Sequence, residues 1–172
     1  MKFKIYTLGC KVNLYESNVM MDLLKNEGYH ETNDIADIYI INTCSVTNTA
    51  DNKSLKLVKR AIKENKDALI IVCGCMSQEE NVVKEIMEHH PYVDIVFGTH
   101  NINDLPKLII EANQKLNIEV YSIEGDIIEN MPSKRDSKYK AWVNIMYGCD
   151  KFCTYCIVPY TRGKQRRRRP EE

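Results

Sequence analysis

Short apolar runs alternate with stretches of helical periodicity over the first 123 residues, and this alternation restricts the chain to few folds. Four runs are rich in Ile, Val and Tyr, as buried strands are: residues 3–8, 37–42, 69–73 and 93–97. Helical stretches follow at 13–26, 49–63, 78–89 and 103–116, and a last short strand is expected at 118–122. Repeated strand–helix units with short connections wind right-handedly into a parallel sheet. We therefore predict an α/β fold, a Rossmann-like parallel sheet with helices on both faces.

Composition excludes several other classes of protein. The 172 residues are 44% hydrophobic and 28% charged, which supplies enough apolar material for a core. No apolar run approaches the roughly 20 residues that span a bilayer, and the N-terminus has no apolar signal-peptide region. We therefore expect a cytoplasmic protein with no membrane partner. Cytoplasmic thiols stay reduced, so clusters among the seven cysteines are first interpreted as metal or redox ligands.

The chain is expected to divide near residue 124. Residues 124–138 are polar and show neither helical nor strand periodicity, which predicts an interdomain linker. Residues 1–133 carry 13 Lys and Arg against 20 Asp and Glu, whereas residues 134–172 carry 11 against 4. The run Arg166–Arg169 in the basic part would attract a polyanion, although a solvated charge run is the simpler interpretation.

Residues 139–172 are too few to bury a core of their own. Residues 140–147 alternate like a strand, with Trp142 as a core aromatic, and residues 148–163 are expected to form a loop. We therefore expect this segment to be the truncated start of a second domain, and the sequence does not show whether the truncation is natural.

Three cysteines in this loop, Cys149, Cys153 and Cys156, form the most informative motif; we call them the loop trio. Structural zinc takes four ligands, usually in paired C-x-x-C knuckles, and no second knuckle follows. A cubane iron–sulfur cluster accepts three thiolates and leaves one iron open to an exogenous group. The spacing therefore favours a catalytic cluster. The alternative is a non-enzymatic zinc or nucleic-acid-binding module, with a fourth cysteine on the zinc and the arginine run on phosphates.

Three further cysteines, Cys10, Cys44 and Cys75, follow the first three predicted strands; we call them the rim trio. The carboxyl ends of parallel strands meet at one edge of a sheet, which is where doubly wound folds keep their sites. We therefore expect the rim trio to meet there. Cys73 lies inside an apolar run and is interpreted as a small core residue.

Four segments together resemble the tRNA methylthiotransferases of the radical S-adenosylmethionine superfamily. The segment Cys149-Asp150-Lys151-Phe152-Cys153-Thr154-Tyr155-Cys156, with residues 157–163 after it, is similar to that family's signature. Residues 9–13, 42–44 and 74–76 resemble segments of its N-terminal domain. The resemblance covers essentially the whole chain and implies the N-terminal portion of such an enzyme. Residues 1–123 would be its cluster-binding domain, and residues 139–172 the first strand and cluster loop of a truncated radical (β/α) barrel.

The resemblance implies two 4Fe-4S clusters and S-adenosylmethionine as cofactors. The loop trio would hold the cluster that binds S-adenosylmethionine, with Tyr155 in the same cofactor-binding loop. The rim trio would hold a second cluster that supplies or carries sulfur. An electron-donor protein is implied as a partner, no further catalytic residue is assigned, and the oligomeric state is not indicated.

The activity implied by the resemblance is the addition of a methylthio group to C2 of an N6-modified adenosine next to the anticodon of tRNA. Residues 73–79, 97–102 and 140–161 resemble the branch acting on isopentenyl-adenosine, whereas residues 7–13 and 44–48 resemble the threonylcarbamoyl branch. We favour the isopentenyl branch; the threonylcarbamoyl branch and a ribosomal-protein-modifying branch are alternatives. Because a (β/α) barrel takes on the order of 200 residues, this chain alone is expected to be inactive.

Overall fold

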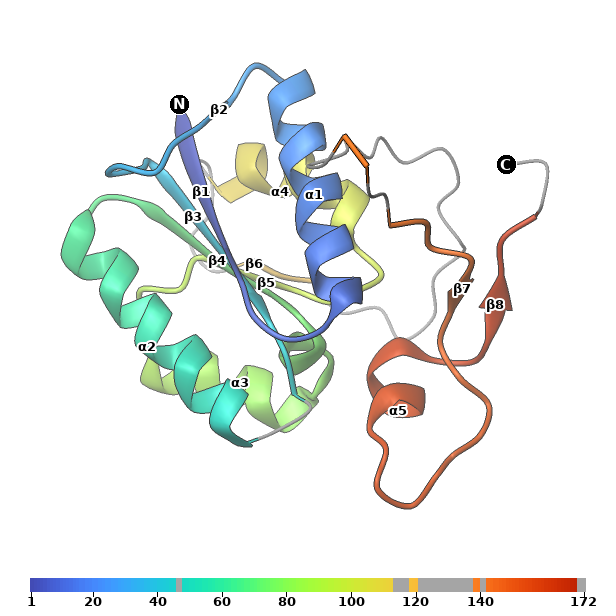
Figure 1. The fold of residues 1–172 in the computed structure, drawn as a ribbon. Helices are drawn as coiled ribbons and strands as arrows, with labels where there is room; N and C mark the ends of the chain where they lie inside the picture. The colour runs from blue at the N-terminus through green and yellow to red at the C-terminus, as the bar shows by residue number, and fades with distance from the viewer. Residues whose placement is uncertain (46–47, 113–117, 121–137, 140–141, 170–172) are drawn as a thin grey trace.

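Six parallel strands form the central sheet of the computed structural model, which describes residues 1–45, 48–112, 118–120, 138–139 and 142–169 (Figure 1). The strand order is β2-β1-β3-β4-β5-β6. The strands are β1 (Lys2–Thr7), β2 (His30–Glu31), β3 (Ile38–Thr43), β4 (Leu69–Gly74), β5 (Ile95–Phe97) and β6 (Ile118–Val120). The predicted α/β fold with a parallel sheet is therefore confirmed.

Helices cover both faces of this sheet (Figure 1). They are α1 (Lys11–Asn26), α2 (Asn48–Glu64), α3 (Glu80–His89) and α4 (Leu105–Ala112), with 3-10 turns η1 (Cys75–Gln78) and η2 (Ile102–Asp104). Helices α1 and α4 lie together on one face, and α2 and α3 lie on the other. The predicted ends of these helices agree within a few residues, and residues 113–117 lie outside the described part of the chain.

Strand β3 shows why the strands were recognisable in the sequence. All six of its residues are buried, because β1 and β4 flank it and helices cover both of its faces. Ile38 and Ile40 pack into the cluster under α1 and α4, whereas Tyr39 and Ile41 pack into the cluster under α2 and α3. Successive side chains of a strand point to opposite faces, so a strand covered on both faces has a continuous apolar run, here residues 38–41, and not an alternating pattern.

Strand β2 is not among the predicted strands. It has two residues, His30 and Glu31, which are exposed and polar and so give no apolar pattern. Its pairing with β1 nevertheless matters, because β1 then has β2 on one side and β3 on the other. The chain changes direction across the sheet at this place, and the carboxyl ends of β1 and β3 flank the crevice where doubly wound folds bind ligands.

The prediction of a strand over residues 140–147 is wrong in extent. Within the described residues 142–147, only β7 (Met146–Tyr147) is a strand, and it pairs antiparallel with β8 (Arg166–Arg167), while residues 142–145 are irregular. The ring of Trp142 is not in the core; the residue is 49% exposed. The predicted loop of residues 148–163 also contains a short helix, α5 (Val158–Arg162).

The predicted linker lies almost wholly in residues that the structure does not describe. Residues 124–137 of the predicted linker lie outside the described residues, so the domain division stays a prediction. Within the described residues, no helix combines the length and the apolar character needed to cross a bilayer.

Truncation of the central core is expected to destabilise the fold strongly. Ile71 of β4 is fully buried, so Ile71→Ala should lower the free energy of unfolding by about 2–5 kcal/mol. Ile110→Ala on α4 is the control; that side chain is 56% exposed, and its loss should cost under about 0.5 kcal/mol. Urea unfolding followed by circular dichroism measures both, and equal midpoints for the two variants would contradict this description of the core.

Candidate functional site

The carboxyl ends of three neighbouring strands bring the rim trio to one edge of the sheet. Cys10 precedes the first turn of α1 after β1, Cys44 follows β3, and Cys75 follows β4. Thr43 and Gly74, the residues before Cys44 and Cys75, are paired in register, so these two cysteines leave the sheet at the same level. Cys10 follows β1 and Cys44 follows β3, the two strands between which the order of strands along the chain changes direction. The sequence predicted this shared edge.

Glycines make the close approach of the strand ends possible. Gly9 has φ +100°, and a Cβ placed on it would lie 2.4 Å from Cys44 Cβ and 2.6 Å from Cys44 Sγ. Gly74 has φ +96°, and its Cβ would lie 2.4 Å from the Thr43 carbonyl oxygen. Both positions combine a left-handed backbone with crowding, which only glycine tolerates. The Cys44 side chain therefore occupies the place that a side chain at position 9 would take.

Asn13 is the polar residue that connects the rim. Its side chain is fully buried, and its Nδ2 donates a hydrogen bond of 2.6 Å to the Thr43 carbonyl, next to Cys44. The Cys10 thiol donates to Asn13 Oδ1 at 3.5 Å. Asn42 Nδ2 donates to the Asn13 carbonyl and to Ser17 Oγ, both at 3.0 Å. These bonds tie the ends of β1 and β3 to the first turns of α1.

Arg162 of α5 reaches into the same edge from far along the sequence. Its Nη1 donates to Glu16 Oε1 at 2.5 Å, and its Nη2 donates to Glu16 Oε2 at 3.1 Å. Nη2 also contacts Asn13 Oδ1 at 3.1 Å and Cys75 Sγ at 3.4 Å. The Arg162 and Glu16 side chains are only 10% and 3% exposed. A forked, buried ion pair of this kind fixes distance and orientation together.

Burial and charge act in opposite directions on the groups around Arg162. Burial raises the pKa of the Cys75 thiol above its usual range, and the neighbouring Arg162 charge opposes that rise. Burial alone would lower the pKa of Arg162, but Glu16 and Cys75 outweigh it and raise that pKa. A cationic neighbour favours the thiolate, which is the form that binds metals.

Cys73 differs from the rim trio in its surroundings. It is 1% exposed within the core cluster under α1 and α4, and its Sγ lies 3.9 Å from Met20 Sδ. Burial raises the pKa of its thiol well above the usual range, and the charge of Glu16 adds to this effect. The prediction that Cys73 is a core residue is confirmed.

The loop trio lies on a loop closed at its base. Cys149 lies two residues after strand β7, and its backbone N donates to the Gly163 carbonyl at 3.1 Å. Within the loop, Cys156 N donates to the Cys153 carbonyl at 2.9 Å. Cys153 is exposed, while Cys149 and Cys156 are half-buried. Tyr155 is 90% exposed, so its ring projects into solvent.

The donors in both trios suit a thiolate-bound cluster, although their present contacts are to protein groups. All six cysteines are free. Within the described residues, no three or more His, Cys, Asp or Glu side chains are grouped so as to hold a metal ion. Cys10 and Cys75 instead contact Asn13 and Arg162. Three thiols that follow neighbouring strand ends at one edge of the sheet fit the ligand chemistry of an iron–sulfur cluster.

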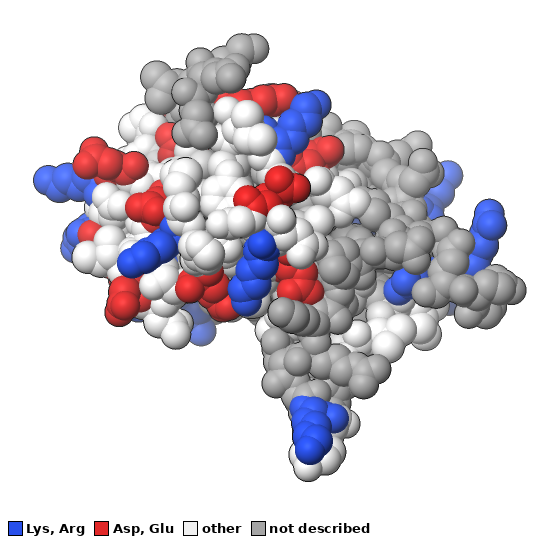
Figure 2. Space-filling model, turned by 90° about the horizontal axis from the view of Figure 1, so that it is seen from above, with Lys and Arg blue, Asp and Glu red and all other residues white. Residues whose placement is uncertain are grey.

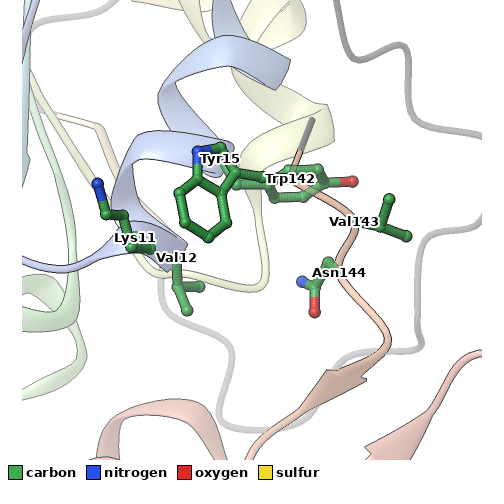
Figure 3. A pocket seen from close by; sticks show the side chains of 6 residues that line it. All are labelled: Lys11, Val12, Tyr15, Trp142, Val143 and Asn144. Atoms are coloured by element: carbon green, nitrogen blue, oxygen red, sulfur yellow. The ribbon is translucent and has the colours of Figure 1, made fainter. Parts of the chain in front are cut away.

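A small pocket adjoins the rim (Figure 3). Its volume is about 100 Å³, and it is lined by Lys11, Val12, Tyr15, Trp142, Val143 and Asn144. The start of α1 forms one side and residues 142–144 form the other, with Lys11 Nζ 5.0 Å from the centre of the Trp142 ring. Pockets for drug-sized ligands measure roughly 300–1,000 Å³, so this space is too small for a ligand of that size.

Charge is distributed unevenly over the surface. Figure 2 shows acidic and basic side chains mixed over the sheet domain, and basic side chains on the visible part of the side where β7 and β8 lie. Four basic residues also follow one another along α2 and line a shallow hollow: Lys56, Lys59, Arg60 and Lys63.

Residues 2–98, which include the whole rim trio, match the family described as Uncharacterized protein family UPF0004. The chain belongs to this family. The UPF0004 match covers β1 to β5 and the crevice between β1 and β3, so the family is defined by the part of the chain that builds the cysteine edge.

Curated relatives of this UPF0004 chain are named "tRNA-2-methylthio-N(6)-dimethylallyladenosine synthase". It is 53% identical to the one from Bacillus velezensis and 52% to the one from Bacillus subtilis, each over 99% of the chain and 35% of the relative. Identity to the Staphylococcus epidermidis protein is 54%, over 99% of the chain and 34% of the relative. The chain therefore spans about a third of the length of the curated relatives it matches. The resemblance indicated by the cysteine segments is confirmed.

Sequence reasoning missed Glu16 and Arg162 as members of the site. Glu16 occurs on the buried face of α1, where Asn13 and Ser17 are also polar, and an acid on such a face signals a buried partner. Nothing in the sequence identifies that partner, because 146 positions separate the two residues.

Crowding at Gly9 gives a prediction with a matched control. Gly9→Ala should lower the free energy of unfolding by about 1–3 kcal/mol more than Gly28→Ala, because the new methyl overlaps the Cys44 side chain. Gly28 also has a left-handed backbone (φ +81°) but has open space around it, so it isolates the backbone strain. Denaturant unfolding measures the difference, and equal losses for the two variants would contradict the close approach of Gly9 and Cys44.

Proposed function

We propose that this chain is the N-terminal cluster-binding part of an enzyme that adds a methylthio group to C2 of isopentenyl-adenosine in tRNA. The proposal is supported by the similarity of the chain to named synthases together with the positions of its rim cysteines. The chain is 52–54% identical over 99% of its length to synthases of 2-methylthio-N(6)-dimethylallyladenosine. Its three rim cysteines follow three neighbouring strands at one edge of the sheet.

Cys10, Cys44 and Cys75 would hold one 4Fe-4S cluster. Three protein thiolates on a cubane leave one iron without a protein ligand, and that open iron supplies the chemistry of binding sulfur or S-adenosylmethionine. The residues of the chain have separate tasks around it. Asn13 and Asn42 hold the strand ends in place, and Gly9 leaves room for the Cys44 side chain itself.

Cys149, Cys153 and Cys156 would hold the second cluster. Their backbone is braced where Cys149 N donates to Gly163 and where β7 pairs with β8. The exposed Cys153 and Tyr155 leave this loop open on one side, which suits access for S-adenosylmethionine. We keep Tyr155 as a cofactor-binding candidate on that ground.

Transfer RNA is the proposed partner, and the basic surfaces support it. Basic side chains occur in β8 and in a row along α2, where Arg60 is also paired with Glu64, and lysine and arginine gain affinity for phosphates by releasing counterions. The relatives' printed name specifies a dimethylallyl group, which favours the isopentenyl branch over the threonylcarbamoyl branch. An electron-donor protein completes the proposed partners. The inactivity of this chain by itself stays a prediction.

Anaerobic reconstitution with iron and sulfide tests the ligands. The unaltered chain should bind about eight iron atoms, and Cys→Ala at position 10, 44 or 75 should lower this to about four. Cys73→Ala is the control and should bind as much iron as the unaltered chain, because that thiol is buried in the core. Iron and sulfide analysis with visible absorbance gives the result. A colourless protein with stoichiometric zinc would support the zinc-module alternative instead.

The activity of the whole protein is tested on tRNA from cells that lack the complete gene. Mass analysis of their nucleosides should show isopentenyl-adenosine without its methylthio group, and the complete gene should restore the group. A gene copy with Cys44→Ala should fail to restore it, whereas Cys73→Ala should restore it. An unchanged amount of methylthio-isopentenyl-adenosine after deletion would contradict the proposed substrate. Loss of the methylthio group from threonylcarbamoyl-adenosine would assign the protein to the other branch.

A further inference from the structure

A buried ion pair between Arg162 and Glu16 attaches α5 to the sheet domain. Arg162 ends α5, six residues after Cys156, and its guanidinium is enclosed by Glu16, Asn13 and Cys75. Thr99 Oγ1 adds a hydrogen bond of 3.2 Å to the Thr161 carbonyl, and η1 packs directly against α5. The side chain that joins the two segments thus touches one rim cysteine itself.

The loop trio is mechanically coupled to Arg162. The Gly163 carbonyl, one residue further on, accepts the hydrogen bond from Cys149 N. Arg166 Nη2 donates to the Arg162 carbonyl at 3.1 Å, which connects the same turn to β8. A displacement of Arg162 would therefore move both ends of the loop that carries the trio.

Glu16 and Arg162 differ in the length of the helix that holds each of them. Glu16 lies in the middle of the rigid helix α1, one turn from Asn13. Arg162 lies at the end of a five-residue helix, whose own hydrogen bonds cannot orient it firmly. The fork of Arg162 on Glu16 is therefore the interaction that gives α5 its place.

We propose that Arg162 is a positioning residue: its buried pair with Glu16 docks the loop trio against the rim trio and sets the separation of the two cysteine sites. The docking of the loop trio against the rim trio follows from the contacts of this chain alone. That it also sets the distance between two clusters rests on the proposed function. Arg162 acts through Glu16 and the loop and takes no part in the chemistry itself.

The test measures proximity of the trios in the apo chain. A short bifunctional thiol reagent is added, and peptides crosslinked between the rim and loop cysteines are quantified by mass spectrometry. Arg162→Met and Glu16→Gln should each lower the yield of these crosslinks at least about tenfold, because either change removes the ion pair. Arg162→Lys keeps the charge but loses the fork, so it should give an intermediate yield. Arg169→Met, at an exposed arginine, is the matched control and should leave the yield unchanged.

Circular dichroism of each variant separates positioning from folding. The sheet signal should stay unchanged in Glu16→Gln, which preserves side-chain volume. Three outcomes would overturn the proposal: no rim-to-loop crosslinks in the unaltered chain, unchanged yields in Arg162→Met and Glu16→Gln, or loss of the sheet signal in both variants.

Iron content of the same preparations keeps the two proposals distinguishable. Crosslinks that depend on Arg162 in a chain that binds no iron would support the positioning role and contradict the cluster assignment. Normal iron binding with crosslink yields that do not change in Arg162→Met would support the cluster assignment and contradict the positioning role.

Discussion

The buried ion pair between Arg162 and Glu16 is the constraint on which the relation between the two cysteine segments depends. Both side chains are nearly inaccessible to water, so each charge is compensated only by its partner and by neighbouring polar groups. Removing one partner of such a pair costs about 3–5 kcal/mol, whereas a well-packed apolar replacement of both is often neutral. The pair therefore contributes a defined arrangement more than it contributes net stability.

The site itself is a product of sheet topology. Strand β1 pairs with the two-residue strand β2 on one side and with β3 on the other, so Cys10 and Cys44 follow neighbouring strands at the place where the strand order changes direction. Asn13 then satisfies the polar groups that the ends of the strands leave unpaired. Because these hydrogen bonds are buried, the edge has little freedom to rearrange.

Much of this arrangement could be predicted from the sequence, and the exceptions have physical reasons. Strands β3 and β4 were predictable because burial on both faces gives a continuous apolar run, and the placement of Cys44 and Cys75 followed from parallel pairing. Strand β2 is exposed and polar, so no periodicity marks it. The role of Arg162 escaped prediction because its partner is set by tertiary packing and not by local pattern.

The separation of 146 positions between Glu16 and Arg162 has a consequence for the order of assembly. Contacts this distant along a chain require the largest loop closure, and N-terminal segments fold first during synthesis. The sheet strands and the three rim cysteines are therefore synthesised before Arg162, and we expect the edge that carries them to be open to solvent until α5 packs against it.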